Sequence, residues 1–376
     1  MAPEYRYIDT DEQLQEVVEA CLEVSVIALD TEFARFNTYY PIVGLIQIYT
    51  GAACFLIDPL SVSSIEPLKA VMEERSLLKV LHACSEDMEV FQYALGIVPT
   101  PVYDTQIASA ALGVGFSVGY QALVEHYLDI SLSKDQTRSD WLARPLTTSQ
   151  LDYAALDVIH LLEVYKVQLE ALEGGPKLGW VEAESLGLGQ GIPTVAAPED
   201  SYKKFKGLWQ LNRMQLNLLK DLCSWREITA RKEDIPRNRV VDQKSLVLIV
   251  KEEVSSMQGF QNVAGLTSKQ VRKYGDQILV IQAEARLVHE EDCPEIFVRT
   301  DAPINNKKLK RLKRVVEERA LSLSIAPELL TKRRHLEKLI RSEDAQGKYH
   351  LPRELGGWRE SVIGEALLAE LLEPSS

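Results

Sequence analysis

The sequence of 376 residues lacks the signatures of a membrane protein or a secreted protein. No stretch approaches about 18 uninterrupted apolar residues, the minimum for a membrane-spanning helix. The first residues, MAPEYRYIDTDEQ, contain no basic segment followed by an apolar run, as an export signal would. We therefore expect neither export nor a membrane span, and we expect a cytoplasmic protein.

Cysteine is scarce, with five residues in the whole chain. Their number is odd, they are widely scattered, and they show neither CxxC nor a Cys/His spacing typical of metal ligands. Disulfide scaffolds and structural zinc sites are therefore excluded. The cysteines are expected to be reduced thiols.

The chain also lacks a net positive charge, and its formal charge is -13. Taken for the whole chain, this value argues against a polyanionic partner. The charge is, however, unevenly distributed: residues 1–170 carry a net -16, residues 202–290 a net +6 and residues 301–376 a net +3. Such an asymmetry between an acidic and a basic half indicates a nucleic-acid partner.

The front of the chain contains four apolar segments with the length of strands. Residues 24–33 (VSVIALDTEF) are apolar on both faces, as in a central strand covered by helices. Residues 44–50 and 53–59 are separated by a short turn around Gly51, so an antiparallel hairpin is expected. A helical stretch at about 65–75 leads to a fourth strand at 77–83.

Helical spacing dominates after residue 83. The segments SEDMEVFQYAL, YDTQIASAAL and YQALVEHYL precede a long helix that starts after Thr147, which forms a capping box with Gln150. Residues 173–200 contain six Gly and three Pro, so regular structure should mostly stop there. The predicted division is an α/β domain at 1–172, a linker at 173–200, and two all-helical domains at 201–290 and 291–376.

Two acids end the most apolar strand. Asp30 and Glu32 are two residues apart, so both carboxylates lie on one face of the strand, where they repel each other unless a cation compensates them. A solvated strand end is an equally open interpretation. Asp87, just after the fourth strand, is a further candidate ligand, although acids in a first helical turn usually favour the helix dipole.

Tyr153 and Asp157 lie four residues apart on one face of the long helix. Alone, such a pair is more often a helix-surface feature. With the acids before it, the pair completes an order of Asp-x-Glu, Asp and Tyr-x3-Asp. A set of oxygen ligands of this size suits Mg²⁺ or Mn²⁺ rather than zinc.

This order resembles the tyrosine-containing form of the DEDD exonuclease superfamily. The segments IALDTEF, TYYPIVGLIQI, IDPL, LHACSEDMEVF, DTQIA, RSDWLARPL and DYAALD are similar to the ribonuclease D family over most of residues 1–170. Residues 202–290 resemble the helicase-and-ribonuclease-D C-terminal (HRDC) domain. A second HRDC-like domain is expected in residues 305–376, mainly from chain order and length.

The resemblance implies a ribonuclease-H-like α/β exonuclease domain with a mixed sheet, followed by the HRDC and HRDC-like domains. It implies a monomeric 3′–5′ exoribonuclease that releases nucleoside 5′-monophosphates during maturation of tRNA and other small stable RNAs. Asp30, Glu32, Asp87 and Asp157 would hold two divalent ions, Mg²⁺ or Mn²⁺. Tyr153 would orient the attacking water, because a free tyrosine has a pKa near 10 and is a weak base at neutral pH.

Other residues near these motifs have two interpretations each. Asp104 is either a ligand or a helix cap, and the cap is favoured. His82 is either structural or in contact with the terminal nucleotide, and His160 is either near the ions or simply packed on its helix. Phe33 either stacks on the terminal base or belongs to the core.

Basic residues are the candidates for phosphate contacts. Lys134, Arg138 and Arg144 are three of the nine basic residues within residues 1–170, although Arg144 and Trp141 would equally brace the long helix. In the rear half, Arg237 and Arg239 and the run KKLKRLKR at 307–314 are favoured as RNA contacts, because an acidic nuclease domain needs another surface to hold a polyanion.

Two other functions remain open. One is a DNA exonuclease of the same superfamily. The other is an RNA-binding scaffold with an inactive nuclease domain, which the presence of all four acids and the tyrosine disfavours.

Overall fold

The computed structural model describes residues 3–132, 139–190, 197–297 and 304–373. By their contacts these residues form two compact units. The first unit contains the α/β domain and the C-terminal residues. The second contains the middle of the chain together with residues 35–42. Within the described residues, no helix is long and apolar enough to cross a membrane.

A six-stranded mixed sheet forms the centre of the first unit, in the order β1-β4-β3-β2-β5-β6. The expected hairpin is present, because β3 and β4 pair antiparallel, and β2 is an inner strand that pairs parallel with β5. The two edge strands were missed, since three residues are too few to show an alternating pattern. The strands are β1 (Arg6–Ile8), β2 (Val26–Ala34), β3 (Ile42–Tyr49), β4 (Cys54–Ile57), β5 (Leu78–Leu81) and β6 (Val102–Asp104).

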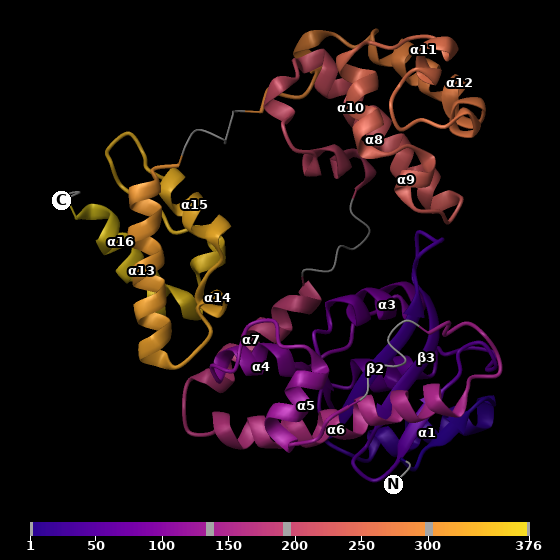
Figure 1. Ribbon diagram of the computed structural model, residues 1–376, viewed down its shortest axis with the longest axis vertical. Helices are drawn as coiled ribbons and strands as arrows, with labels where there is room; N and C mark the ends of the chain where they lie inside the picture. Colours follow the sequence, from indigo (N-terminus) through magenta and orange to yellow (C-terminus); the bar gives the residue numbers. More distant parts are fainter. Residues whose placement is uncertain (1–2, 133–138, 191–196, 298–303, 374–376) are drawn as a thin grey trace. The chain divides into compact units, whose positions relative to one another are not determined.

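Helices cover both faces of this sheet. The longest, α6, begins at the expected capping box of Thr147 and Gln150 and packs against β2, β4 and β5 (Figure 1). The helices of this domain are α1 (Asp11–Leu22), α2 (Leu68–Glu73), α3 (Ser85–Leu95), α4 (Thr105–Ala111), α5 (Tyr120–Leu128), α6 (Thr148–Leu172) and α7 (Lys177–Gln190).

Helix α7 corrects the expectation that regular structure stops in residues 173–200. The helix forms despite its glycines because tertiary packing overrides local propensity. Its Trp180 stacks on Trp358 at a centroid distance of 4.7 Å, and its Glu184 forms an ion pair with Arg359 at 2.5 Å. Both partners come from the C-terminal helical module, whose helices are α13 (Asn306–Leu323), α14 (Pro327–Leu330), α15 (Arg333–Arg341) and α16 (Glu365–Leu372).

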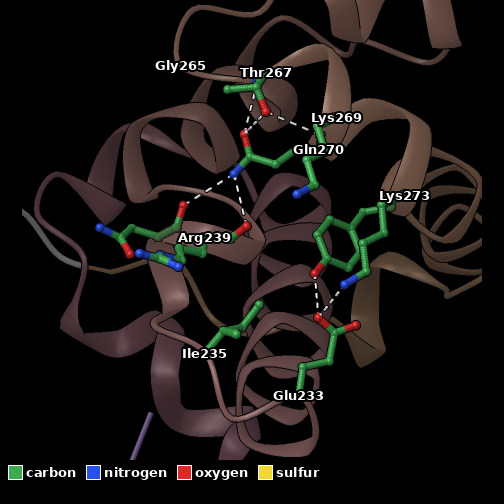
Figure 2. A pocket seen from close by; sticks show the side chains of 10 residues that line it. Glu233, Ile235, Arg239, Gly265, Thr267, Lys269, Gln270 and Lys273 are labelled. Atoms are coloured by element: carbon green, nitrogen blue, oxygen red, sulfur yellow. Dashed lines mark hydrogen bonds and ion pairs between the residues drawn. The ribbon is translucent and has the colours of Figure 1, made fainter. Parts of the chain in front are cut away.

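The second unit is all-helical, as expected. Its core is formed by buried apolar residues such as Leu216, Leu219 and Phe260. An open groove of about 850 Å³ on this unit is lined by Arg239, Lys269 and other polar residues (Figure 2). The helices are α8 (Arg213–Lys232), α9 (Arg237–Val240), α10 (Gln243–Lys251), α11 (Met257–Gln261) and α12 (Ser268–Ala285).

Candidate active site

Strand β2 places two carboxylates on one face of the sheet. Along the strand, Ala28 belongs to the apolar core beneath α6, while Ile27 and Leu29 belong to the core on the other face. Because side chains alternate between faces, Asp30 and Glu32 continue the row of Ala28 and point to the side of α6.

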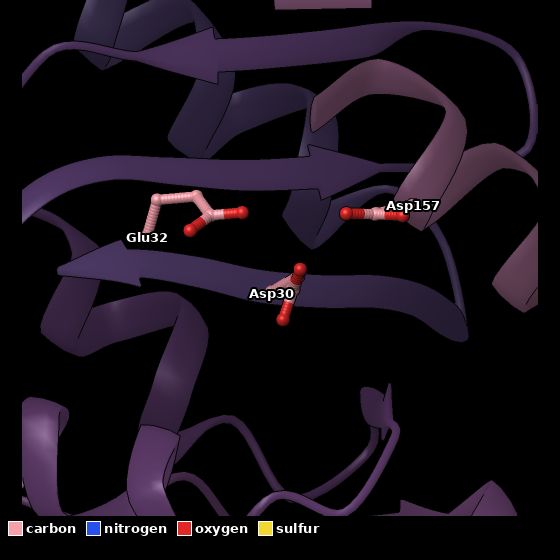
Figure 3. Close-up of side chains that lie close together, drawn as sticks. All are labelled: Asp30, Glu32 and Asp157. Atoms are coloured by element: carbon pink, nitrogen blue, oxygen red, sulfur yellow. The ribbon is translucent and has the colours of Figure 1, made fainter. Parts of the chain in front are cut away.

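Asp157 on α6 meets these two acids. The three side chains can each offer one carboxylate oxygen such that all three oxygens lie within 4.8 Å of one another (Figure 3). They line a cavity of about 280 Å³ that also includes Asp87 and Tyr153. The four acids and the tyrosine selected from the sequence therefore line one cavity.

The carboxylates carry more negative charge than their surroundings compensate. Burial, and next the charge of Asp157, raise the pKa of Asp30 to about 8. Burial, Asp30, Asp157 and Asp87 raise the pKa of Glu32 to about 10. Burial raises the pKa of Asp157 to about 7. A set of partly buried oxygen donors that repel one another fits a hard divalent cation, which would supply a compensating positive charge.

Asp87 holds a slightly different position from the other acids. It is buried, and its carboxylate accepts a hydrogen bond from the Thr31 hydroxyl. Burial and the charge of Asp30 raise its pKa well above the usual value. Asp87 thus lines the cavity without belonging to the three-oxygen group of Asp30, Glu32 and Asp157.

Two tyrosines fix the helical side of the cavity. Tyr153 donates a hydrogen bond to Asp157, which opposes the rise in the pKa of that carboxyl. The Tyr120 hydroxyl on α5 donates to the backbone carbonyl oxygens of Asp157 at 2.5 Å and Leu156 at 3.0 Å. Sequence reasoning missed Tyr120, because its segment YQALVEHYL shows only helical spacing.

Phe33 and His82 both line the cavity. Phe33 is half-buried and packs against the core, as its core interpretation expects, and its stacking on a terminal base stays a prediction. The His82 Nδ1 atom lies 3.0 Å from the Thr105 hydroxyl.

Asp104 serves as a framework acid. It caps α4 and accepts hydrogen bonds from the backbone amides of Ala83, Cys84 and Gln106 at 2.8 to 3.1 Å. These contacts favour the cap over the ligand role. His160 pairs with Glu163 at 2.9 Å and does not line the cavity, which favours the interpretation as a packed helix residue.

The Arg144 guanidinium already has partners within the protein. It forms an ion pair with the buried Asp58 at 2.6 Å and donates to the carbonyl oxygens of Gly44 and Trp141. These bonds favour the bracing role over a phosphate contact. Lys134 and Arg138 lie outside the described residues.

Arg237 and Arg239 lie on the second unit. Arg237 forms an ion pair with the buried Glu227, and Arg239 contacts Asn37 and lines the groove of Figure 2. Arg239 therefore fits an RNA-contacting role better than Arg237, whose charge already has a partner.

Three family models match this chain. A model described as 3′-5′ exonuclease matches residues 5–172, one described as HRDC domain matches residues 215–281, and one described as ribonuclease D, C-terminal HRDC domain matches residues 303–367.

Curated proteins match almost the entire chain. Ribonuclease D of Pseudomonas paraeruginosa is 38% identical over 370 residues, which cover 98% of both chains. Ribonuclease D of Escherichia coli is 36% identical and covers 96% of this chain and 97% of its own.

Solved structures of related nucleases are also similar to this chain. The crystal structure of Escherichia coli RNase D, described as an exoribonuclease involved in structured RNA processing, has a TM-score of 0.91 at 35% identity and covers 98% of both chains. The catalytic core of RRP6 from Trypanosoma brucei has a TM-score of 0.61 at 27% identity, covering 76% of this chain and 80% of its own. The chain therefore belongs to the ribonuclease D family and is a 3′–5′ exoribonuclease.

Proposed function

We propose that this exoribonuclease hydrolyses RNA from the 3′ end, one nucleotide at a time, and releases nucleoside 5′-monophosphates with two divalent ions. The observation that carries the proposal is the group of partly buried carboxylates from Asp30, Glu32 and Asp157, which raise one another's pKa and for which the described residues show no ion pair. Bound Mg²⁺ or Mn²⁺ ions would activate the attacking water and stabilise the leaving 3′-oxygen.

Each side chain of the cavity has a distinct role in this proposal. Asp30, Glu32 and Asp157 hold the ions, and Asp87, which lines the same cavity, completes the ligand set. Tyr153, held by its hydrogen bond to Asp157, orients the water through its hydroxyl. With a raised pKa, these carboxyls bind metal more strongly as the pH rises, because the ions must displace protons.

The groove on the second unit is the proposed grip for the RNA backbone. Arg239 and Lys269 line it, whereas Lys273, which also lines it, is already ion-paired with Glu233 at 2.6 Å (Figure 2). Cations are needed there because residues 1–170 carry a net charge of -16 and would repel a polyanion. This groove supports a role of the HRDC domain in affinity rather than in cleavage.

The physiological setting is part of the same proposal. We assign to this chain the 3′ maturation of tRNA and other small stable RNAs, as a monomer in the cytoplasm. The similarity to an exoribonuclease of structured RNA supports the substrate class. The five free, buried cysteines fit a reducing compartment.

The test is product analysis of a 5′-labelled structured RNA incubated with Mg²⁺ or Mn²⁺, alongside chromatography of the released nucleotides. We expect nucleoside 5′-monophosphates and a ladder that shortens from the 3′ end. Asp30→Asn and Asp157→Asn should abolish release, while Asp129→Asn, an exposed acid at the end of α5, should leave it unchanged. Activity of wild-type magnitude in Asp30→Asn would contradict the proposal.

The same experiment separates the competing functions. Faster degradation of a matched DNA oligonucleotide would favour a DNA exonuclease. Retained RNA binding with no metal-dependent release would favour an inactive scaffold.

A further inference from the structure

All five N–H donors of the Arg144 guanidinium are engaged within the protein. Nε and Nη2 form a fork on the Asp58 carboxylate, at 2.7 and 2.6 Å. Nη2 also donates to the carbonyl oxygen of Gly44 at 2.7 Å. Nη1 donates to the carbonyl oxygens of Trp141 at 2.9 Å and Ala143 at 2.8 Å. Because the guanidinium is planar and rigid, these bonds hold the segment before α6 firmly on the sheet.

Asp58 anchors Arg144 in the sheet. It follows β4 directly and is fully buried. Its carboxylate also accepts hydrogen bonds from the Tyr7 hydroxyl on β1 at 2.5 Å and from the Ser61 hydroxyl at 2.8 Å. Burial would raise the pKa of Asp58, but the hydrogen bonds from Arg144 and Tyr7 outweigh it and hold the pKa well below the ordinary value. The carboxylate therefore stays charged at neutral pH.

Trp141 lies directly against the sheet. A Cβ atom placed on Gly44 of β3 would come within 2.6 Å of the Trp141 carbonyl oxygen and within 2.9 Å of its Cβ atom, which is closer than such atoms approach. Position 44 therefore requires glycine. The Trp141 side chain is buried, and its Nε1 atom has no hydrogen-bond partner in the described residues. Packing of the ring and bonds of the backbone hold Trp141 in place.

The Trp141 ring supports a residue of the catalytic cavity. Its centroid lies 6.3 Å from that of the Tyr153 ring, and the two planes are tilted by 40°. Trp141 is part of the apolar core on the α6 side of the sheet, and Tyr153 packs against that core while it also lines the cavity. A tyrosine side chain has few torsions, so the surface on which its ring packs sets where its hydroxyl lies.

The start of α6 has a cap of its own. Thr147 and Gln150 form a capping box there, with the Gln150 amide 3.3 Å from the Thr147 hydroxyl oxygen. The bonds of Arg144 precede this cap and hold Trp141 instead. Their main effect is therefore on the residue that packs against Tyr153, rather than on the initiation of the helix.

Building on the proposed role of Tyr153 in orienting the water, we propose that Arg144 and Trp141 are positioning residues of the reaction. Arg144, joined to Asp58, holds the Trp141 ring against Tyr153 and thereby sets the position of the Tyr153 hydroxyl in the cavity. All donors of Arg144 are engaged and Trp141 is buried, so neither residue contacts RNA. Their loss must appear in the rate of the chemical step and not in RNA affinity.

Three positions allow this series of contacts to be disturbed separately. Gly44→Ala displaces the Trp141 backbone and leaves the side chains in place. Trp141→Leu removes the aromatic ring, whereas Trp141→Phe keeps a ring and loses no hydrogen bond within the described residues. Arg144→Lys keeps a positive charge beside Asp58 but offers fewer donors, all from one nitrogen.

Two matched substitutions serve as controls. Gly179→Ala on α7 adds a Cβ atom that meets no atom within 4 Å. Arg359→Lys disturbs a guanidinium with the same kinds of contacts, a fork on Glu184 at 2.5 and 2.6 Å and a bond to the carbonyl oxygen of Leu329 at 2.8 Å. Both controls should leave the rate constant of nucleotide release unchanged, although Arg359→Lys should lower stability.

The experiment uses the full-length protein and a 5′-labelled RNA with Mn²⁺. Single-turnover rate constants at saturating enzyme measure release, and fluorescence anisotropy without divalent ions measures RNA affinity. We expect Gly44→Ala, Trp141→Leu and Arg144→Lys to slow release roughly tenfold at unchanged affinity, because a small displacement of a catalytic group has a large effect on rate. Trp141→Phe should retain most of the rate. If Arg144→Lys does not fold, the substitutions at positions 44 and 141 decide.

The same substitutions in a Tyr153→Phe background separate positioning from stability. If the contacts act through the Tyr153 hydroxyl, Trp141→Leu should slow the Tyr153→Phe protein by less than about twofold, because the group that it displaces is already gone. Loss of stability would act equally in both backgrounds. A wild-type rate constant in Trp141→Leu would overturn the proposal, and so would an equal loss of rate in both backgrounds.

A spectroscopic measurement keeps this outcome separate from the proposed function. If the wild type releases no mononucleotide with Mg²⁺ or Mn²⁺, the exonuclease proposal fails. The ¹⁹F resonance of Tyr153 in protein labelled with 3-fluorotyrosine, assigned by its loss in Tyr153→Phe, then still decides the positioning role. A changed resonance in Arg144→Lys and Gly44→Ala supports the proposal, provided that Arg359→Lys and Gly179→Ala leave it unchanged. An unchanged resonance in the first two variants rejects it.

Discussion

The Tyr120 hydroxyl lies 2.5 Å from the backbone carbonyl oxygen of Asp157, so α5 holds α6 at the residue that carries a proposed metal ligand. Tyr120→Phe removes this bond and leaves the ring in place. We expect about 1 kcal/mol less stability and about fivefold slower nucleotide release, because the Asp157 carboxylate is positioned less firmly. Urea unfolding and single-turnover rates measure the two effects.

Tyr127 on the same helix is the matched control for Tyr120. Its hydroxyl is buried and has no hydrogen-bond partner in the described residues, so Tyr127→Phe should leave the rate unchanged and should not lower the stability. If Tyr120→Phe and Tyr127→Phe had the same effect on stability and on the rate of nucleotide release, the hydrogen bond from Tyr120 to the Asp157 carbonyl would have no special role.

Asp157→Asn should stabilise the metal-free protein while abolishing its activity. In the folded state burial raises the pKa of this carboxyl to about 7, from an ordinary value of 3.8. The folded state therefore binds a proton that the unfolded state releases, and stability falls as the pH rises from about 4 to about 7. At pH 8 in EDTA, Asn should add about 1 to 2 kcal/mol.

Hydrogen exchange of the α6 amides measures this gain locally, which is necessary because a chain with two units need not unfold in a single step. At pH 4 the wild type and Asp157→Asn should differ little. A variant that is less stable than the wild type at pH 8 would contradict the interpretation of Asp157 as an uncompensated charge.

Glu227 should stabilise the second unit at neutral pH. It accepts hydrogen bonds from the Tyr39 hydroxyl and from Arg231 and Arg237. Burial raises its pKa, but these partners outweigh burial and lower it to about 2. The stabilisation is present above the ordinary value of 4.5 and is lost as the pH falls towards 2, because the protonated carboxyl no longer pairs with the arginines.

Hydrogen exchange of the α8 amides between pH 6 and 3 tests this expectation. The protection of the wild type should fall with pH, whereas Glu227→Gln should be less protected at pH 6 and depend less on pH. Glu252→Gln, at an exposed position after α10, serves as the control. Parallel pH profiles of the wild type and Glu227→Gln would contradict the assignment.

Lys269→Ala should weaken RNA binding without slowing cleavage of bound RNA. Lys269 is exposed at the start of α12 and lines the groove of Figure 2. If it contacts one phosphate, the slope of log affinity against log salt should decrease by about 1. Lys244→Ala, an exposed lysine on α10 that does not line the groove, is the control.

Fluorescence anisotropy with RNA at several salt concentrations measures that slope, and single-turnover rates at saturating enzyme measure cleavage. An unchanged salt slope in Lys269→Ala would remove the groove from the proposed RNA path.

Local sequence patterns determined much of the fold and of the site. The apolar segment that became β2 carried Asp30 and Glu32 at the spacing of one strand face, and the capping box at Thr147 set the start of α6. Both patterns lie within about ten residues, the range over which strand alternation and helix caps operate. Together with the family resemblance, these patterns pointed to the four acids and Tyr153, and the five side chains line one cavity.

Only the tertiary structure decided which partners these elements have. Helix α7 is packed in place by distant parts of the chain, as in the stacking of Trp180 on Trp358. Arg144 binds Asp58, 86 residues away, and Tyr120 reaches a backbone carbonyl that no side-chain pattern reveals. Interactions between distant residues depend on how the helices and strands pack. The sequence therefore identified the proposed ligands, and the fold determined what holds them in place.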